Sequence, residues 1–281
     1  MHPILLDVFG RQIGTYGLLI VIGVAAAWFL VKLLTKATSK ENKKSEDVSL
    51  VFLICICGGL IGAFLFRPIT RIPEIIINWE SYSQLPFNAM IFFIFRDIVF
   101  YGGLIGGVIA MIIFCRGFKI PILPMADLFA PALALAHGFG RVGCFFAGCC
   151  YGIPVCRSHI FAVTYPYDSL VAPAGATLLA TQLIEAAGLF ILAIILSMVY
   201  IRLYKHGSPK YIGIIVCLYG GIYSIFRFVL EFYRGDIARG IYGALSTSQY
   251  ISIVLFIISI ALICVILRGK SNKLHTNNDS E

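Results

Sequence analysis

The residues best suited to chemistry lie in one stretch, residues 137–152, which reads His-Gly-Phe-Gly-Arg-Val-Gly-Cys-Phe-Phe-Ala-Gly-Cys-Cys-Tyr-Gly. The stretch ends a long apolar run, yet it holds a histidine, an arginine, three cysteines and five glycines. Because an arginine at membrane depth is costly, Arg141 indicates a functional task. The glycines indicate backbone that turns sharply or lets another group come close, and irregular backbone at that depth must be buried in protein or line a wet cavity. We therefore interpret the stretch as the floor of an active site. A glycine-rich helix-packing seam with one snorkelling arginine is the alternative.

Other polar residues at or near membrane depth form three close pairs in the sequence: Gln182 and Glu185, Arg227 and Glu231, Arg234 and Asp236. The first two pairs are three and four residues apart, so each shares one face of a helix. Mutual neutralisation of Arg227 and Glu231 is a simple interpretation. Three arginines nevertheless exceed what Glu231 can neutralise, and this surplus predicts an anionic lipid headgroup as their partner.

The cysteines of this region, Cys144, Cys149, Cys150 and Cys156, have the spacing C-x4-C-C-x5-C. This spacing lacks the C-x2-C pairs of zinc and iron–sulfur sites, so no metal and no other cofactor is predicted. Packing as small hydrophobes is the first interpretation, a disulfide at an oxidising outer face the second and a metal site the third. His137 is a candidate base, but a lone histidine on an apolar helix is more often a structural hydrogen-bonding group.

The composition indicates what must position these residues. The chain has 281 residues, of which 59% are hydrophobic and 13% charged. Apolar runs of about 20 residues recur along it, each long enough to cross a bilayer as a helix. We therefore expect an all-α, polytopic membrane protein that keeps its first span. The net charge of +8 then reflects topology and attraction to anionic lipid, and no nucleic-acid partner is expected.

About seven transmembrane helices are expected, near residues 13–34, 48–66, 98–115, 121–140, 176–201, 211–232 and 245–267. Between the second and third spans, residues 67–96 should lie partly at the membrane interface. Residues 1–270 would form one membrane domain, and residues 271–281 a disordered polar cytoplasmic tail. The sequence holds no sign of a soluble domain.

The basic residues predict the orientation. Every lysine falls in or beside the turns after the first, third and fifth spans, or in the tail. The positive-inside rule then places the C-terminus in the cytoplasm and the N-terminus outside. Basic residues on the outer side are all arginines, whose planar fork suits bidentate phosphate binding better than the lysine ammonium does. The outer face is therefore expected to hold phosphate.

One short sequence occurs twice, as Gly-Gly-Leu-Ile-Gly at residues 58–62 and again at 102–106. A Gly-x-x-x-Gly pattern lets two helices approach closely, and packing alone accounts for the first copy. For the second copy, the preceding Tyr101 and the nearby Arg96 and Asp97 suggest the wall of a site. The repeat is too short to indicate the inverted halves of a transporter.

Five motifs now occur in order along the chain: Thr15-Tyr16-Gly17-Leu18, the second Gly-Gly-Leu-Ile-Gly, Gly140-Arg141-x-Gly143-x-Phe145-x-x-Gly148-x-x-x-Gly152, Thr181-Gln-Leu-x-Glu185 and Arg227-Phe-x-x-Glu231-Phe-x-Arg234. Together they resemble the bacterial prolipoprotein diacylglyceryl transferase family over nearly the whole chain. The resemblance implies a multi-pass enzyme of the bacterial cytoplasmic (inner) membrane that needs no cofactor. Its partners would be membrane lipid, with phosphatidylglycerol as donor, and a prolipoprotein whose lipobox cysteine thiol accepts the diacylglyceryl group as glycerol-1-phosphate leaves.

The resemblance also implies roles for particular residues. Arg141 and Arg227 would hold the phosphate, with Tyr101 as a third catalytic residue. Tyr16 would line the lipid cavity. The substrate-binding residues would be Tyr16, Gly102, Gly103, Gly143, Cys144, Gly152, Gln182, Glu185, Glu231 and Arg234.

The sequence departs from the family pattern at several positions. Tyr101 stands where the family carries a histidine, and Phe64 where it carries an arginine. Cys144, Ala147 and Cys149 replace two asparagines and a glutamate. With a reference pKa of about 10, a tyrosine is a poor base near neutrality. A divergent paralogue with another acceptor, or a phospholipid-binding membrane protein without chemistry, are therefore the alternative functions.

Overall fold

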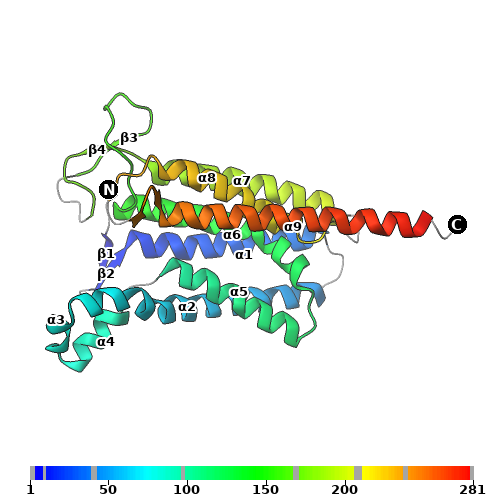
Figure 1. Cartoon of the computed structure of the whole chain (residues 1–281), viewed down its shortest axis with the longest axis horizontal. Coiled ribbons are helices and arrows are strands. Elements are labelled where there is room, and N and C mark those ends of the chain that lie inside the picture. Colours follow the sequence, from blue (N-terminus) through cyan, green and yellow to red (C-terminus); the bar gives the residue numbers. More distant parts are fainter. Residues whose placement is uncertain are drawn as a thin grey trace. The chain divides into compact units, whose positions relative to one another are not determined.

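The computed structural model describes residues 4–8, 11–38, 43–95, 99–166, 171–205, 211–236 and 240–278, and most of these residues are helical (Figure 1). It forms two compact units, one of Met1–Lys40 together with Ala126–Glu281 and the other of Glu41–Met125. Among the described residues, six helices are long and apolar enough to cross a membrane, and Tyr101–Gly117 is a shorter apolar helix at the place of the third expected span. The expectation of an all-α, polytopic membrane protein is confirmed.

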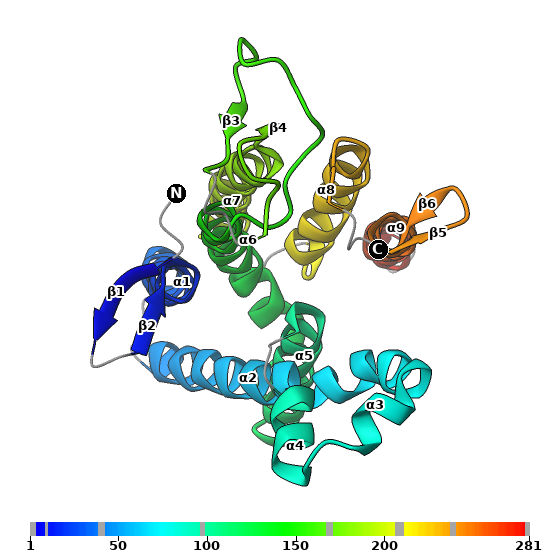
Figure 2. The ribbon, with the colours of Figure 1, turned by 90° about the vertical axis from the view of Figure 1, so that its left-hand side faces the viewer.

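The larger unit is a bundle of five long helices that run side by side. They are α1 (Thr15–Thr38), α6 (Ile122–Ala147), α7 (Thr181–Tyr204), α8 (Ile214–Glu231) and α9 (Thr247–Asn278). Figure 2 looks along these helices from one end. At that end α1, α7 and α9 begin while α6 and α8 end (Figure 1). The residues singled out for chemistry lie near these helix ends, for example at the end of α6, the start of α7 and the end of α8. The fold therefore brings them to one end of the bundle.

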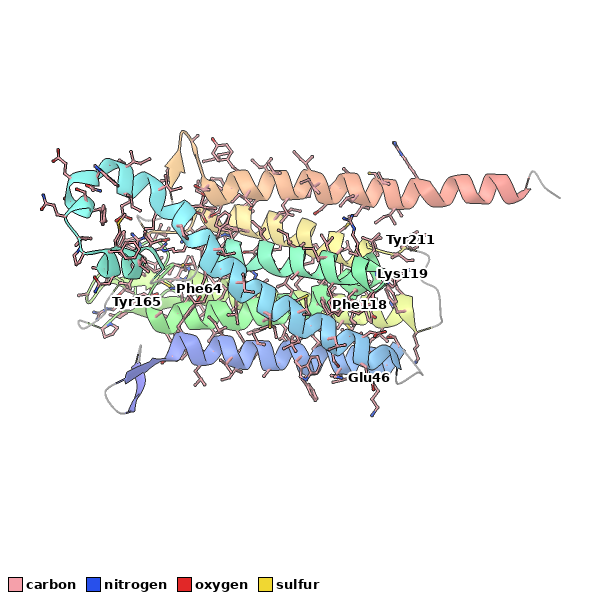
Figure 3. The ribbon with its side chains drawn as sticks, turned by 90° about the horizontal axis from the view of Figure 1, so that it is seen from below. Glu46, Phe64, Phe118, Lys119, Tyr165 and Tyr211 are labelled. Atoms are coloured by element: carbon pink, nitrogen blue, oxygen red, sulfur yellow. The ribbon has the colours of Figure 1, made fainter. Side chains whose placement is uncertain are left out.

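Three short hairpins lie at this same end of the larger unit (Figure 1). Antiparallel pairs are formed by β1 (Ile4–Val8) with β2 (Arg11–Gly14), β3 (Ala162–Thr164) with β4 (Thr177–Leu179), and β5 (Ile241–Tyr242) with β6 (Leu245–Ser246). Tyr165, beside β3, is fully buried and lies at the opposite end of the unit from Tyr211 (Figure 3). Because β3 lies in the segment after α6 and β4 ends just before α7, the β3–β4 hairpin joins this segment to the start of α7.

The smaller unit contains α2 (Lys43–Ile77), α3 (Trp79–Ser83), α4 (Phe87–Phe95) and α5 (Phe100–Gly117). Glu46 near the start of α2 and Lys119 just after α5 lie at the same end of this unit, so the two helices are antiparallel (Figure 3). The repeated glycines lie at their crossing. A Cβ atom added to Gly102 would lie 2.5 Å from the Gly62 carbonyl oxygen, and one added to Gly106 would lie 2.8 Å from the Gly62 Cα. Each copy of the repeat therefore packs against the other, and this use accounts for Gly102 without a ligand.

Several expected boundaries were wrong. The helix α2 continues past residue 66 to Ile77, because its charged residues find partners locally. Arg71 pairs with Glu74, the Tyr82 hydroxyl donates to Glu74 at 2.9 Å, and the Arg71 guanidinium lies 4.3 Å from the centre of the Phe93 ring. The tail expected to be disordered from residue 271 is helical as far as Asn278. Arg96 and Asp97 lie outside the described residues.

Candidate active site

Residues 137–147, which were expected to have irregular backbone, belong to the end of helix α6. It stays helical through Ala147, so irregular backbone begins only at Gly148. The glycines of its last turns serve helix packing instead. A Cβ atom at Gly138 would lie 2.5 Å from a ring carbon of Phe190 on α7, and one at Gly143 would lie 2.9 Å from the Tyr16 ring on α1. Small residues thus let α1 and α7 pack closely against α6.

The chain turns sharply directly after α6. Gly148 and Cys150 both have positive φ, 73° and 60°, and the Cys149 amide donates to the Cys144 carbonyl at 3.1 Å. The start of α7 holds this turn in place. The Gln182 side-chain nitrogen donates to the Cys149 carbonyl at 2.7 Å, and the Thr181 hydroxyl donates to the Cys150 carbonyl at 2.9 Å. Three hydrogen bonds therefore fix the conformation of this turn.

A continuous chain of ion pairs links α6, α7 and α8. The Arg141 Nε lies 3.0 Å from Glu185 Oε1, and Arg227 Nη1 lies 3.2 Å from the other oxygen of Glu185. Arg227 Nη2 lies 2.6 Å from Glu231 Oε2, which is also 3.4 Å from Arg234 Nη1. Both glutamates are only 2% exposed. A buried carboxylate shared between two arginines meets the requirement that buried charges be paired.

The expected surplus of unpaired arginines was wrong. Glu185, which was expected to be a substrate-binding residue, is the shared acceptor of Arg141 and Arg227. Arg234 has its own carboxylate, since its Nε donates to Asp236 Oδ1 at 2.8 Å. The expected pairing of Arg227 with Glu231 across one helical turn is confirmed. Three arginines are thus matched by three carboxylates.

Arg141 differs from the other two arginines because only part of its guanidinium is used. Among the described residues its Nε is paired with Glu185, and no protein acceptor contacts its Nη1 or Nη2. Its side chain is 15% exposed, compared with 7% for Arg227 and 9% for Arg234. The two Nη groups of a guanidinium form the fork that binds phosphate oxygens in bidentate fashion. Arg141 is therefore the arginine with donors available for a ligand.

Sequence reasoning missed two residues that complete this network. The Tyr223 hydroxyl donates to Glu185 Oε1 at 2.9 Å, and Arg227 Nη2 donates to the Ser248 hydroxyl at 3.2 Å. A signal for the tyrosine was present, since positions 219, 223, 227 and 231 recur every four residues along one face of α8. His137, on α6, is buried against this face of α8, with its Nδ1 3.4 Å from the Tyr219 hydroxyl. This contact favours the structural interpretation of His137.

Gly152 and Gln182 make contacts in the turn that follows α6. The Gly152 amide donates to the Leu179 carbonyl at 2.9 Å, and a Cβ atom added at Gly235 would lie 2.5 Å from the Gly152 oxygen. Gly235 thus allows the segment carrying Arg234 to pack directly on the turn. The Gln182 Oε1 is buried and has no hydrogen-bond partner among the described residues. It remains an acceptor available to a ligand donor.

Three cysteines meet beside Arg141. The Sγ atoms of Cys144, Cys149 and Cys150 all lie within 4.8 Å of one another, and the structure shows every cysteine of the chain as a free thiol. Hydrogen bonds from Cys144 and Cys149, together with the positive charge of Arg234, lower the pKa of the Cys150 thiol below its ordinary value. Neither the disulfide interpretation nor simple packing predicted this grouping. Cys156 is exposed and lies outside the cluster.

The predicted residues divide between the two units. Tyr101, Gly102 and Gly103 belong to α5 in the smaller unit, where Tyr101 is 43% exposed. The others assemble in the larger unit, from α1, α6, α7, α8 and the adjoining loops: Tyr16, Arg141, Gly143, Cys144, Gly152, Gln182, Glu185, Arg227, Glu231 and Arg234.

Apolar helices that enclose a chain of buried ion pairs, with one arginine fork left available, define a polytopic membrane protein with a candidate anion-binding site. The sequence pattern of the family described as prolipoprotein diacylglyceryl transferase matches residues 3–265. The chain therefore belongs to the prolipoprotein diacylglyceryl transferase family, as its five motifs predicted.

Individual relatives agree with this membership. A phosphatidylglycerol–prolipoprotein diacylglyceryl transferase of Clostridium tetani is 36% identical over 260 residues, which cover 92% of this chain and 96% of the relative. Clostridium perfringens has two similar proteins with numbered names. The one named transferase 2 is 37% identical, with 93% of this chain and 94% of the relative covered, and the one named transferase 1 is 28% identical, with 97% and 98% covered.

Proposed function

We propose that this protein transfers the diacylglyceryl group of phosphatidylglycerol to the lipobox cysteine thiol of a prolipoprotein and releases glycerol-1-phosphate. The names of the relatives, which match more than nine-tenths of the chain, support the two substrates. The single structural observation that carries the proposal is the fork of Arg141, which is anchored at Nε and available at both Nη groups.

The reaction joins sulfur to carbon. The acceptor sulfur attacks the glyceryl carbon that bears the phosphate ester, and the carbon–oxygen bond breaks. The electron pair leaves with the phosphate, which becomes a monoester, and the thiol proton is released. An enzyme can accelerate this step by holding both substrates together and by stabilising the charge that gathers on the departing phosphate.

The contacts suggest different roles for the two central arginines. Arg141 binds the phosphate directly through Nη1 and Nη2. Arg227 is held by Glu185, Glu231 and Ser248, so it supports the site by fixing Glu185. Glu185 in turn holds the Nε edge of Arg141 and leaves both Nη groups available. Preorganised donors of this kind need no rearrangement when charge develops.

Three further assignments complete the proposal. Gln182 Oε1, which lacks a partner among the described residues, accepts a hydrogen bond from a headgroup hydroxyl. Tyr16, packed on Gly143, lines the lipid side. The protein lies in the cytoplasmic membrane with its N-terminus outside and its C-terminus inside, which the positions of the lysines support.

The test uses the purified full-length protein in vesicles. Vesicles that contain phosphatidylglycerol, mixed with a lipobox peptide, should yield the thioether peptide and an equal amount of glycerol-1-phosphate. A peptide with serine in place of the lipobox cysteine is the control and should give neither product. Release of glycerol-1-phosphate without thioether would indicate another acceptor, and lipid binding without either product would indicate a binding protein. Either result would refute the proposal.

A further inference from the structure

The three-cysteine cluster is a set of ligands without an assigned purpose. Cys144 lies in the last turn of α6, while Cys149 and Cys150 follow the tight turn at Gly148. Their sulfur atoms all lie within 4.8 Å of one another. A tetrahedral zinc ion with Zn–S bonds of about 2.3 Å holds its sulfur ligands about 3.8 Å apart, so small side-chain adjustments would let these three thiolates share one ion.

The backbone is built to bring these sulfurs together. Cys150 and Lys119 are the only non-glycine residues with positive φ in the described part of the chain. This conformation is unfavourable for an L-residue and persists where the surroundings enforce it. Here Thr181 and Gln182 enforce it by binding the carbonyls of Cys150 and Cys149. The turn folds back on the helix end, which is why a C-x4-C-C spacing gathers three ligands without a C-x2-C pair.

The surroundings also suit the charge of such a site. Three thiolates and one Zn²⁺ carry a net charge of −1, which requires compensation in an apolar environment. Arg141 and Arg234 lie within electrostatic range of Cys150, so their guanidinium groups would face the thiolates although each is also paired with a carboxylate. Both arginines are held in place by carboxylates, Arg141 by Glu185 and Arg234 by Asp236. The cluster therefore lies beside the same arginine that is proposed to bind the phosphate.

We propose that Cys144, Cys149 and Cys150 bind a zinc ion through three thiolates, and that its open fourth position binds the acceptor cysteine of the substrate. This inference rests on the proposed function. Zinc sites with three protein ligands keep a fourth position for water or substrate, and a thiol that coordinates zinc is deprotonated. His137 contacts Tyr219 and Tyr223. Because zinc would itself deprotonate the acceptor thiol, the reaction would need no histidine base.

The step balances without an oxidant or reductant. The acceptor thiol displaces water from zinc and loses its proton to solvent. Its sulfur then attacks the glyceryl carbon, and the carbon–oxygen bond breaks. The electron pair leaves on the phosphate, whose oxygens face the Arg141 fork. The thioether that forms is a weaker ligand than a thiolate, so the product leaves the zinc and a new acceptor can bind.

The first test measures the metal itself and does not depend on turnover. Full-length protein purified without chelators should contain about one zinc per chain, and replacing the ion with Co²⁺ should give thiolate-to-cobalt charge-transfer absorption. Each of the variants Cys144→Ser, Cys149→Ser and Cys150→Ser should lose the zinc and this absorption. Cys156→Ser, in the same loop, and Cys264→Ser, on α9, should keep both. Equal thermal unfolding of all five variants with zinc removed would show that the fold is preserved.

The second test concerns the fourth ligand. Adding the lipobox peptide to the cobalt form should shift the absorption, whereas the peptide with serine in place of cysteine should leave it unchanged. Zinc-free wild-type protein that transfers at the full rate would overturn the inference and leave the proposed function intact. A disulfide between any two of the three cysteines in active protein, found by mass spectrometry, would also overturn it. Bound zinc with no transfer to any peptide would instead refute the proposed function and, with it, the acceptor-thiol ligand.

Discussion

Replacing Glu185 with glutamine tests the ion-pair chain at its centre. Glu185 accepts from Arg141, Arg227 and Tyr223, so the substitution removes the charge that holds two arginines and turns one contact into a clash of donors. Breaking a buried ion pair by removing one partner costs about 3–5 kcal/mol. Arg227 keeps Glu231, and Arg141 is 15% exposed, so the lower end of that range, about 3 kcal/mol, is expected.

The same change should also reduce activity, since it releases the anchored edge of Arg141. Misplacing a catalytic group by about 1 Å can cost about 100-fold in rate, and we expect a loss of that order. The assay pairs turnover in phosphatidylglycerol vesicles with thermal unfolding in detergent, where a loss of about 3 kcal/mol corresponds to a shift of roughly 6–12 °C. Glu80→Gln, an exposed carboxylate change on α3, is the control. A Glu185→Gln protein as stable and as active as wild type would refute the ion-pair chain.

Four further predictions follow from particular contacts. Gly106→Ala should destabilise the α2–α5 crossing by about 1–3 kcal/mol, measured by thermal unfolding, whereas Gly117→Ala, where nothing lies within 4 Å, should have little effect. Asp127→Ala should cost about 3 kcal/mol, because it leaves the amides of Gly213, Ile215 and Val216 and the Tyr204 hydroxyl without their acceptor; an unchanged unfolding temperature would contradict this. Tyr223→Phe should lower turnover by at most about tenfold, since one hydrogen bond to Glu185 is lost. A fluorescent protein fused to the C-terminus should fluoresce in the cytoplasm, and an alkaline phosphatase fusion there that is active would contradict the orientation.

Apolar runs were sufficient to predict the spans, but not where charged residues extend a helix. The α2 helix continues to Ile77 because Arg71 is neutralised by Glu74 and stacks on Phe93. Such contacts involve residues from α4, which sequence spacing does not reveal. The glycines at 138 and 143 were expected to mark sharp turns or close approach of another group, and in the structure they make room for the rings of Phe190 and Tyr16.

The charged residues of the candidate site were predictable, but their connections were not. Spacing alone predicted the pairing of Arg227 with Glu231, because both lie on one helix. The role of Glu185 depends on three helices meeting, so its bonds to Arg141 and Arg227 could not be inferred from spacing. A metal site at the cysteines was ranked third, after packing and a disulfide, for a related reason. Sequence motifs for zinc sites describe pairs of cysteines in one short turn, such as C-x2-C. Here the end of α6 and a left-handed conformation at Cys150 together bring three sulfurs close.

The most direct test of the central claim is the rate of glycerol-1-phosphate release by Arg141→Lys at saturating phosphatidylglycerol. Lysine keeps the positive charge but loses both the anchored Nε and the fork, so we predict a fall of about 100-fold in turnover. Arg202→Lys, an exposed arginine at the far end of α7, should match wild type. Turnover by Arg141→Lys equal to that of wild type would contradict the assignment of Arg141 as the residue that binds the phosphate.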